Sequence, residues 1–255
     1  MLIVAKILIG FLVGTLIGMT GVGGGVLLLP ILIFALRVPP IVAVGSDALF
    51  NFVTRLGSSY VHLTRGTVKR KVVLSLAAGS IPGSILGVGM LRHLRTLYGS
   101  GVNTFITMAV GILLIIVPTL LMFQSQIEEH VAHRPPTLKS LVGMSVIGLL
   151  AGFLVGMTSV GSGSIIMMLL LLFYSFPPNM MVGADIVHGV LLTGVTSFLH
   201  FKLGNVDPYL VGSLVIGSIP GGLFGSHLST RMPVPWLRRI VCAALLATGA
   251  RMLWA

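Results

Sequence analysis

Eight long apolar segments dominate the sequence and limit what it can fold into. They cover residues 3–36, 40–63, 72–91, 102–123, 139–174, 179–201, 209–228 and 236–254. A membrane-spanning helix needs about 20 consecutive apolar residues, and the alternating pattern of a membrane β-barrel is absent from these segments. Charged residues make up 8% of the chain, against about 25% in a soluble domain. The sequence therefore predicts an all-α integral membrane protein with about eight hydrophobic segments.

The charge balance fits a lipid environment better than a nucleic-acid partner. The chain carries 16 Lys and Arg against 5 Asp and Glu, a net charge of +11. Basic residues at the ends of spans hold loops on the cytoplasmic side and contact anionic lipid headgroups. No basic run is interleaved with aromatic residues, as a nucleic-acid surface would require. The single cysteine, Cys242, excludes an internal disulfide and a cysteine-based metal site.

An internal repeat relates the two halves of the chain at a shift of 138 residues. At that shift Gly18-Met19-Thr20 aligns with Gly156-Met157-Thr158, Asp47 with Asp185, His62 with His200, and Gly79 to Gly83 with Gly217 to Gly221. Aligned Gly, Pro, Asp and His residues over this length indicate a duplication. We therefore divide the chain into a first transmembrane repeat (1–123), a central connection (124–138) and a second transmembrane repeat (139–255), with four segments in each repeat.

The first segment of each repeat is too long for one straight crossing. Residues 3–36 and 139–174 would each reach about 50 Å as a helix, against a hydrocarbon core of about 30 Å. Both are interrupted by Gly-rich sequence, at 21–25 and 159–164. Each repeat is therefore predicted to begin with a Gly-broken or re-entrant helix. The relative orientation of the repeats stays open, because the Lys and Arg of the loops divide nine to six in both the parallel and the inverted arrangement.

Three motifs together resemble the TauE/SafE family of sulfite and organosulfonate exporters, also called the TSUP family. They are Gly18 to Gly25, Val44-Gly45-Ser46-Asp47-Ala48 and Gly79 to Gly83, each with an echo in the second half. The resemblance covers nearly the whole chain. It implies a permease for small sulfur-containing anions in the cytoplasmic membrane of a bacterium or archaeon. The second copy departs from the first where Ser159, Ser162 and Ser164 replace Gly21, Gly24 and Val26, so the two half-sites are expected to differ.

The Gly-rich breaks are the first candidates for the anion site. A broken helix presents unpaired backbone N–H groups and a favourable dipole to an anion, and corresponding breaks in two repeats point to a transporter's substrate site. The candidate substrate-binding residues are Thr20, Gly21, Val22, Gly23, Gly24, Gly25, Arg55, Thr158, Ser159, Val160, Gly161, Ser162, Gly163 and Ser164. Close helix packing is the alternative role for such glycines, and it suits Gly14 with Gly18 and Gly79 with Gly83.

Arg55 is a candidate because it lies in the middle of the apolar segment 40–63. A cation inside the membrane is costly and indicates a functional site by default. Its guanidinium could bind an oxyanion directly, or it could form an ion pair with Asp47, two helical turns earlier on the same face. Its counterpart in the second repeat is Thr193, so the charge is not duplicated.

Five residues are candidates for ion coupling or gating: Asp47, Asp185, His188, Pro82 and Pro220. The carboxylates could carry a proton or a cation, or they could cap the start of their helices. A histidine can transfer protons near neutral pH. The prolines inside spans are expected to kink the helix, and could form a hinge or a second wall of the pathway. We expect His62 and His200 to be interfacial rings instead.

These features favour a secondary transporter over an enzyme. The chain has no Gly-x-x-x-x-Gly-Lys-Ser/Thr loop, so it is not expected to hydrolyse ATP. Gly161 to Ser164 resembles a serine nucleophile motif only weakly, and Glu128, Glu129, His130 and His133 are better explained as a solvated loop than as a metal site. No catalytic residue, metal or cofactor is expected. Export of a sulfur anion is the leading hypothesis, and uptake of another small anion is the alternative. A homodimer stays open.

Overall fold

The computed structural model describes residues 2–20, 24–64, 66, 68–123, 138–163, 166, 178–229 and 234–254. Every regular element in these ranges is a helix, so the predicted all-α class is confirmed for them. The first half contains α1 (Leu2–Thr20), α2 (Gly24–Pro30), the π-helix η1 (Ile31–Ala35), α3 (Pro40–Thr64), α4 (Arg70–Tyr98), the 3-10 helix η2 (Gly99–Gly101) and α5 (Val102–Met122). The second half contains α7 (Leu138–Thr158), α9 (Pro178–Lys202), α10 (Pro208–Ser229) and α11 (Val234–Trp254).

Four stretches of the described residues are long and apolar enough to cross a membrane. They are Arg70–Met122, which contains both α4 and α5, and Leu141–Thr158, Val182–Lys202 and Pro208–Leu228. Ile3–Met19 and Gly24–Ala35 are shorter apolar helices. Helix α3 is not among these spans, because its buried face carries polar side chains such as Ser46, Asp47 and Asn51. The chain is therefore a multi-pass membrane protein in which one face of α3 carries buried polar side chains.

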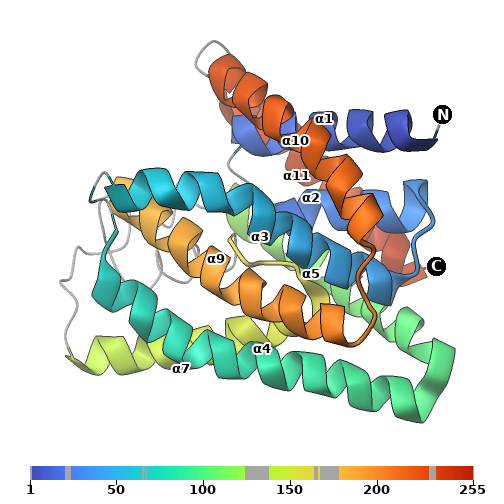
Figure 1. Ribbon diagram of the computed structural model, residues 1–255, viewed down its shortest axis with the longest axis horizontal. Helices are drawn as coiled ribbons and strands as arrows, with labels where there is room; N and C mark the ends of the chain where they lie inside the picture. The colour runs from blue at the N-terminus through green and yellow to red at the C-terminus, as the bar shows by residue number, and fades with distance from the viewer. Residues whose placement is uncertain are drawn as a thin grey trace.

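The first long segment is broken, as its glycines predict. Helix α1 ends at Thr20 and a new helix begins at Gly24. In Figure 1, α1 leads away from the side on which the N-terminus lies, and α2 with η1 returns to that side before α3 begins. Residues 21–23, the centre of the predicted break, lie outside the described residues. Segment 3–36 therefore forms two helical stretches that run in opposite directions rather than one straight helix.

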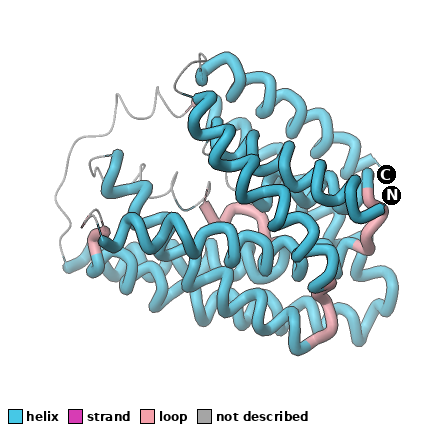
Figure 2. The backbone as a smooth tube through the Cα atoms, turned by 45° about the horizontal axis from the view of Figure 1, so that its top comes forward, coloured by secondary structure: helices cyan, strands magenta, loops and turns pink. Residues whose placement is uncertain are grey.

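The matching segment of the second half is interrupted after α7. Residues 159–163 form an irregular turn in which Ser159 (φ 57°) and Gly161 (φ 93°) adopt left-handed backbone conformations. Most loops in Figure 2 lie at the ends of the helix bundle, whereas this turn lies in its interior. Val160 at its centre is fully buried. The predicted interruption is therefore present here, and Ser164 and residues 167–177 lie outside the described part of the chain.

The gap between the apolar segments 72–91 and 102–123, where the sequence suggests a loop, is mostly helical. The polar run from Arg92 to Tyr98 continues α4 without interruption until Gly99. Leu91 is buried and Leu94 packs against the core, whereas Arg92 and His93 are exposed. An amphipathic turn with no glycine or proline extends a helix rather than ending it. The polar residues therefore mark one face of α4 and not its end.

Glycines bring two pairs of helices into close contact. A Cβ atom on Gly14 of α1 would lie 2.3 Å from the carbonyl oxygen of Ser218 in α10. The residues 138 positions away behave in the same manner, since a Cβ on Gly152 of α7 would lie 2.1 Å from the carbonyl oxygen of Ser80 in α4. The predicted packing role of Gly14 and its neighbours is confirmed. Helix α1 lies on α10, and α4 lies on α7, because only glycine permits these distances.

Helices α3 and α9 pack against each other in opposite directions at the centre of the molecule (Figure 1). Gly45 near the start of α3 contacts Asn205 just beyond the end of α9, and Arg55, late in α3, contacts Gly189 in the first half of α9. By contrast, α1 and α10 run parallel, since Gly10 meets Leu214 and Gly18 meets Gly222. The central contact is therefore made by one helix from each half, α3 from the first and α9 from the second.

Candidate functional site

The inner face of α3 is built from polar residues one helical turn apart. Asp47, Asn51 and Arg55 follow one another at intervals of four, so they lie on the same side of the helix. Asp47 is 0% exposed and Asn51 is 1% exposed. The Asn51 side-chain amide donates both to the backbone oxygen of Asp47 and to its Oδ2, each at 2.9 Å. The sequence analysis missed Asn51, although its spacing from the two charged residues places it on their face.

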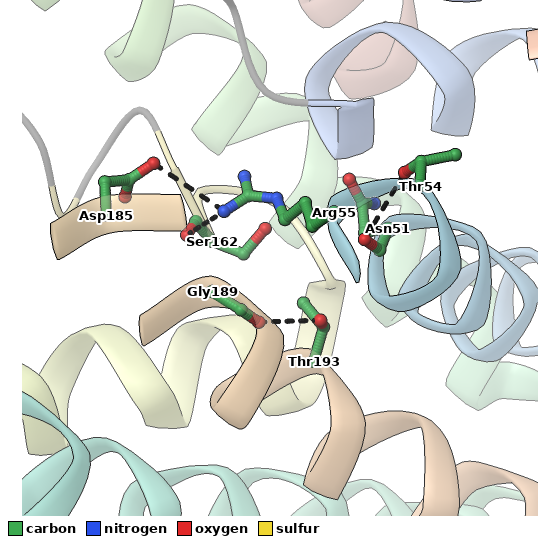
Figure 3. Close-up of polar contacts among 7 residues, drawn as sticks. All are labelled: Asn51, Thr54, Arg55, Ser162, Asp185, Gly189 and Thr193. Atoms are coloured by element: carbon green, nitrogen blue, oxygen red, sulfur yellow. Dashed lines mark hydrogen bonds and ion pairs between the residues drawn. The ribbon is translucent and has the colours of Figure 1, made fainter. Parts of the chain in front are cut away.

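Arg55 reaches from this face into the second half of the chain. Its Nη1 donates to the backbone oxygen of Ser162 at 3.4 Å and lies 3.6 Å from Oδ2 of Asp185 (Figure 3). The two charged side chains are 12% and 10% exposed. Of the two roles considered for Arg55, the ion pair with Asp47 is not found, and its carboxylate partner is Asp185 instead. Asp47 lies two turns away on the same helix, whereas the antiparallel contact with α9 brings Asp185 directly to the guanidinium.

Two glycines leave the space that the guanidinium fills. A Cβ atom on Gly189 would lie 1.9 Å from Nη1 of Arg55, and one on Gly163 would lie 2.6 Å from Nη2. Any larger residue at position 189 would displace Arg55 or shift α9. Gly163 was a candidate from its motif, but Gly189 was not. The sequence signal that could have identified Gly189 is its position inside an apolar span, directly after His188.

Asp47 has neutral partners that come from both halves. The Ser159 hydroxyl donates to Oδ2 at 2.7 Å, beside the bond from Asn51. The left-handed backbone of Ser159 turns its side chain toward α3. A Cβ on Gly25, at the start of α2, would lie 2.6 Å from the backbone oxygen of Ser159 and 2.8 Å from Oδ2 of Asp47. The two Gly-rich breaks therefore meet around this carboxylate.

Three buried atoms at this site have no hydrogen-bond partner among the described residues. They are Oδ1 of Asp47, Oδ1 of Asp185 and Nδ1 of His188. The other ring nitrogen of His188, Nε2, lies 2.7 Å from the Ser80 hydroxyl of α4. Buried polar atoms normally have partners, so an exception calls for an explanation such as a bound ligand or ion. The unpartnered atoms and Arg55 together form a polar centre between the two halves.

The other candidate residues lie farther from this centre or outside the described parts of the chain. Thr158 uses its hydroxyl locally, because it donates to the backbone oxygen of Leu154 at 2.7 Å. His200 is fully buried rather than interfacial, and its Nε2 lies 3.0 Å from the backbone oxygen of Gly156. Of the remaining candidates, the side chain of Thr20 and all of Gly21, Val22, Gly23, Ser164 and residues 124–137 lie outside what the structure describes.

Pro82 and Pro220 do not line this centre. Both lie on exposed faces of helices, α4 and α10, that continue through the proline. Glycines on a neighbouring face of each helix make the contacts with α7 and α1. Because both prolines are exposed, they form no second wall at this centre, and their role as a hinge stays a prediction.

The two histidines considered as partners of Ser162 have other hydrogen-bond partners among the described residues. His188 pairs with Ser80, and His200 pairs with the backbone of Gly156. Neither histidine is paired with Ser162. The backbone oxygen of Ser162 accepts a hydrogen bond from Arg55. The described residues include no group of three His, Cys, Asp or Glu side chains placed to hold a metal ion. The arrangement offers a buried cation between two carboxyl groups, which suits the binding of a small anion or the transfer of a proton.

Comparisons with known proteins agree with this description. The model of the family described as sulfite exporter TauE/SafE matches residues 6–252. The chain is 35% identical over 254 residues to a Bacillus subtilis (strain 168) protein described as probable membrane transporter protein YjnA, covering 98% of this chain and 99% of that one. It is 26% identical to probable membrane transporter protein YunE of the same organism, covering 98% and 97% of the two chains.

A probable membrane transporter protein of Xylella fastidiosa (strain 9a5c) is 24% identical over 251 residues, covering 96% of this chain and 92% of that one. No solved structure matches the chain. The family match extends over nearly the whole chain, as the three sequence motifs predict. This chain, a multi-pass membrane transporter, therefore belongs to the sulfite exporter TauE/SafE family.

Proposed function

We propose that this protein is a secondary transporter that exports a small sulfur-containing anion, such as sulfite or an organosulfonate, across the cytoplasmic membrane of a bacterium or archaeon. The observation that carries the proposal is the position of Arg55. Its side chain, 12% exposed, lies where α3, α9 and the turn after α7 meet. A buried cation at the contact between two transmembrane halves is a functional site by default.

The chemistry of this centre suits an oxyanion. A guanidinium presents several N–H donors in one plane and can bind two oxygens of a sulfite or sulfonate group at once. The glycines at 163 and 189 keep side chains away from its nitrogens. The Ser159 hydroxyl, which now donates to Asp47, lies on the turn that also contacts Arg55 through Ser162. One cation with nearby neutral donors can hold a small anion without a metal or cofactor.

The packing of the helices supports an inverted relation between the two repeats. Helices α3 and α9 are counterparts at the shift of 138, and they run antiparallel. A two-fold axis that exchanges antiparallel helices lies perpendicular to them. The close contact of Gly111 in α5 with Gly249 in α11, which are also counterparts, supports an axis that passes between those helices. Inverted repeats with a central site are typical of transporters that expose the site to one side at a time.

The membrane potential can drive export. The sequence contains no phosphate-binding loop for ATP. An anion that leaves a negative cell interior gains about 2.3 kcal/mol per charge per 100 mV. Movement of the two halves against each other around Arg55 would then be sufficient for transport, and the gradients would set its direction.

The proposal is tested with the purified chain in proteoliposomes loaded with radiolabelled sulfite or sulfoacetate. We expect efflux that increases when the potential is made negative inside, and a loss of at least about 100-fold in Arg55→Gln. Arg95→Gln is the matched control, because Arg95 is exposed and bonds to Asn205 away from the centre. Absence of transport of any such anion in either direction would refute the proposal, whereas inward accumulation alone would identify the protein as an uptake permease.

A further inference from the structure

The two carboxylates of the centre differ in what neutralises them. Asp47 accepts hydrogen bonds from Ser159 and Asn51, both uncharged. Asp185 instead pairs with Arg55, with 3.6 Å between Nη1 and Oδ2. Its Oδ1 is buried and has no hydrogen-bond partner among the described residues. Within the described residues, Asp185 is therefore held in the centre by the guanidinium rather than by neutral donors.

We infer that Asp185 occupies Arg55 in place of the transported anion, so that the anion binds only when Asp185 releases Arg55 and takes up one proton. The inference rests on the proposed function, because it assumes that Arg55 is the residue that binds the anion. It goes beyond that function in two respects: Asp185 competes with the substrate for Arg55, and transport is coupled to a proton.

The space around the guanidinium makes simultaneous binding difficult. Gly189, Gly163 and the backbone oxygen of Ser162 enclose Nη1 and Nη2 closely. Asp185 lies on this enclosed side, since a Cβ on Gly163 would be 3.2 Å from its Oδ2. An anion that takes these N–H groups must therefore displace the carboxylate. A bound anion would form the ion pair with Arg55 that Asp185 forms in this structure.

The charges that face Asp185 determine its protonation once it leaves Arg55. Helix α3 contributes Arg55 and Asp47, α9 itself contributes His188, and the parts of α4 and the turn after α7 that face the centre contribute the neutral Ser80, Ser159 and Ser162. With the anion on Arg55, an ionised Asp185 would be a second buried negative charge without a partner. Such a charge is strongly unfavourable in a low-dielectric interior, and neutralisation by a proton removes the cost.

The binding step balances in charge and in atoms. The ion pair Arg55⁺–Asp185⁻, one anion and one proton from solution give Arg55⁺ paired with the anion and a neutral Asp185 carboxylic acid. With a monoanion the centre keeps the same net charge before and after loading. With a dianion the loaded centre gains one negative charge, so a potential that is negative inside still favours export.

The test is calorimetric titration of the purified full-length chain with thiosulfate or sulfoacetate, in buffers of different ionisation enthalpy and at about pH 6 and about pH 8. These anions keep their charge over this range, so a change in proton binding reports on the protein. We expect about one proton to be taken up per anion near pH 8, and an affinity that rises as pH falls, by up to roughly tenfold per pH unit.

Asp185→Asn is expected to bind the anion at least about tenfold more tightly near pH 8, with no proton uptake and no dependence on pH. Asp207→Asn is the matched control, because Asp207 bonds to the backbone of Leu210 at the start of α10, away from Arg55. It should keep the affinity and the proton count of the unchanged protein. His188→Gln tests the other proton acceptor that α9 places at this centre, and it should keep the proton uptake.

Weaker anion binding by Asp185→Asn, or proton uptake that persists in it, overturns the inference. Loss of uptake in His188→Gln alone also overturns it and assigns the proton to His188. If Asp185→Asn does not fold, the unchanged protein decides, because anion binding without proton uptake contradicts the inference. That result leaves the proposed function intact, whereas failure of the unchanged protein to bind any oxyanion refutes the proposed function itself.

Discussion

The two halves of the protein place different chemistry at corresponding positions around the central contact. In the first half, Asn51 fills the position that corresponds to Gly189, and it bonds to Asp47. In the second half, Gly189 leaves that space empty of side chain, and Arg55 extends into it from the other half. Thr193, the counterpart of Arg55, only bonds back to the Gly189 carbonyl oxygen at 2.7 Å.

If the two halves are read as the repeats that the sequence predicts, this difference leaves one candidate site rather than two. The shared features, the broken helices and the glycine contacts, build the frame in both halves. Two pairs of corresponding positions differ: Arg55 corresponds to Thr193, and Asn51 corresponds to Gly189. As a result, one guanidinium lies near both Asp47 and Asp185. We expect substitutions on the Arg55–Asp185 side to affect both anion binding and stability, and substitutions on the Asp47 side to affect stability with little effect on anion binding.

The largest effect is expected from Gly189→Ala. The added methyl group would lie 1.9 Å from Nη1 of Arg55, so the guanidinium must leave its position. Misplacement of a binding group by about 1 Å can cost about 100-fold, and we expect at least that loss in anion flux. Gly57→Ala in α3 is the control, because a Cβ there meets nothing within 4 Å. Unchanged flux in Gly189→Ala would show that the position of Arg55 is not important.

The next largest effect is expected on the free energy of unfolding, which should fall more in Asp185→Ala than in Asp47→Ala. Removal of Asp185 leaves a buried guanidinium without its ion pair, at a cost of about 3–5 kcal/mol. Removal of Asp47 leaves the Ser159 and Asn51 donors unpaired, at about 1–3 kcal/mol. Unfolding of each variant in detergent measures the difference. An equal or reversed order would contradict the distinction between the two carboxylates.

A smaller effect is expected from Ser159→Ala. It removes one hydrogen bond to Asp47 and should lower stability by about 1–2 kcal/mol, with anion affinity changed by less than about threefold. Thr248→Ala is the control, because its exposed hydroxyl bonds only within its own helix. A large loss of anion affinity in Ser159→Ala would place the substrate on the Asp47 side and not beside Asp185.

The sequence predicted the frame of this site better than its contacts. Glycine-rich runs inside apolar segments revealed the interruptions next to Gly24 and at Ser159, because few other residues would break a helix there. Arg55 was recognisable as a cation inside an apolar span. Its partner was not, because the choice between Asp47 and Asp185 depends on how α3 and α9 pack against each other.

Orientation was the second feature that the sequence left undetermined. The loop charges divide equally well in two arrangements, whereas the contacts of Gly45 with Asn205 and Gly189 with Arg55 fix α3 and α9 as antiparallel. The role of Gly189 could not be predicted for the same reason. It leaves room for the Arg55 side chain, and that contact is known only from the packing of α3 on α9. Long-range contacts, rather than local propensity, carry this information.

The central claim, that Arg55 binds the transported anion, is tested most directly by equilibrium binding. The unchanged protein, Arg55→Ala and the control Arg95→Ala are titrated with sulfite, sulfate, thiosulfate, taurine and sulfoacetate, and thermal stabilisation is recorded for each. We predict that at least one sulfur oxyanion stabilises the unchanged protein and Arg95→Ala, and that Arg55→Ala loses this stabilisation. Equal stabilisation of Arg55→Ala and the unchanged protein would contradict the account.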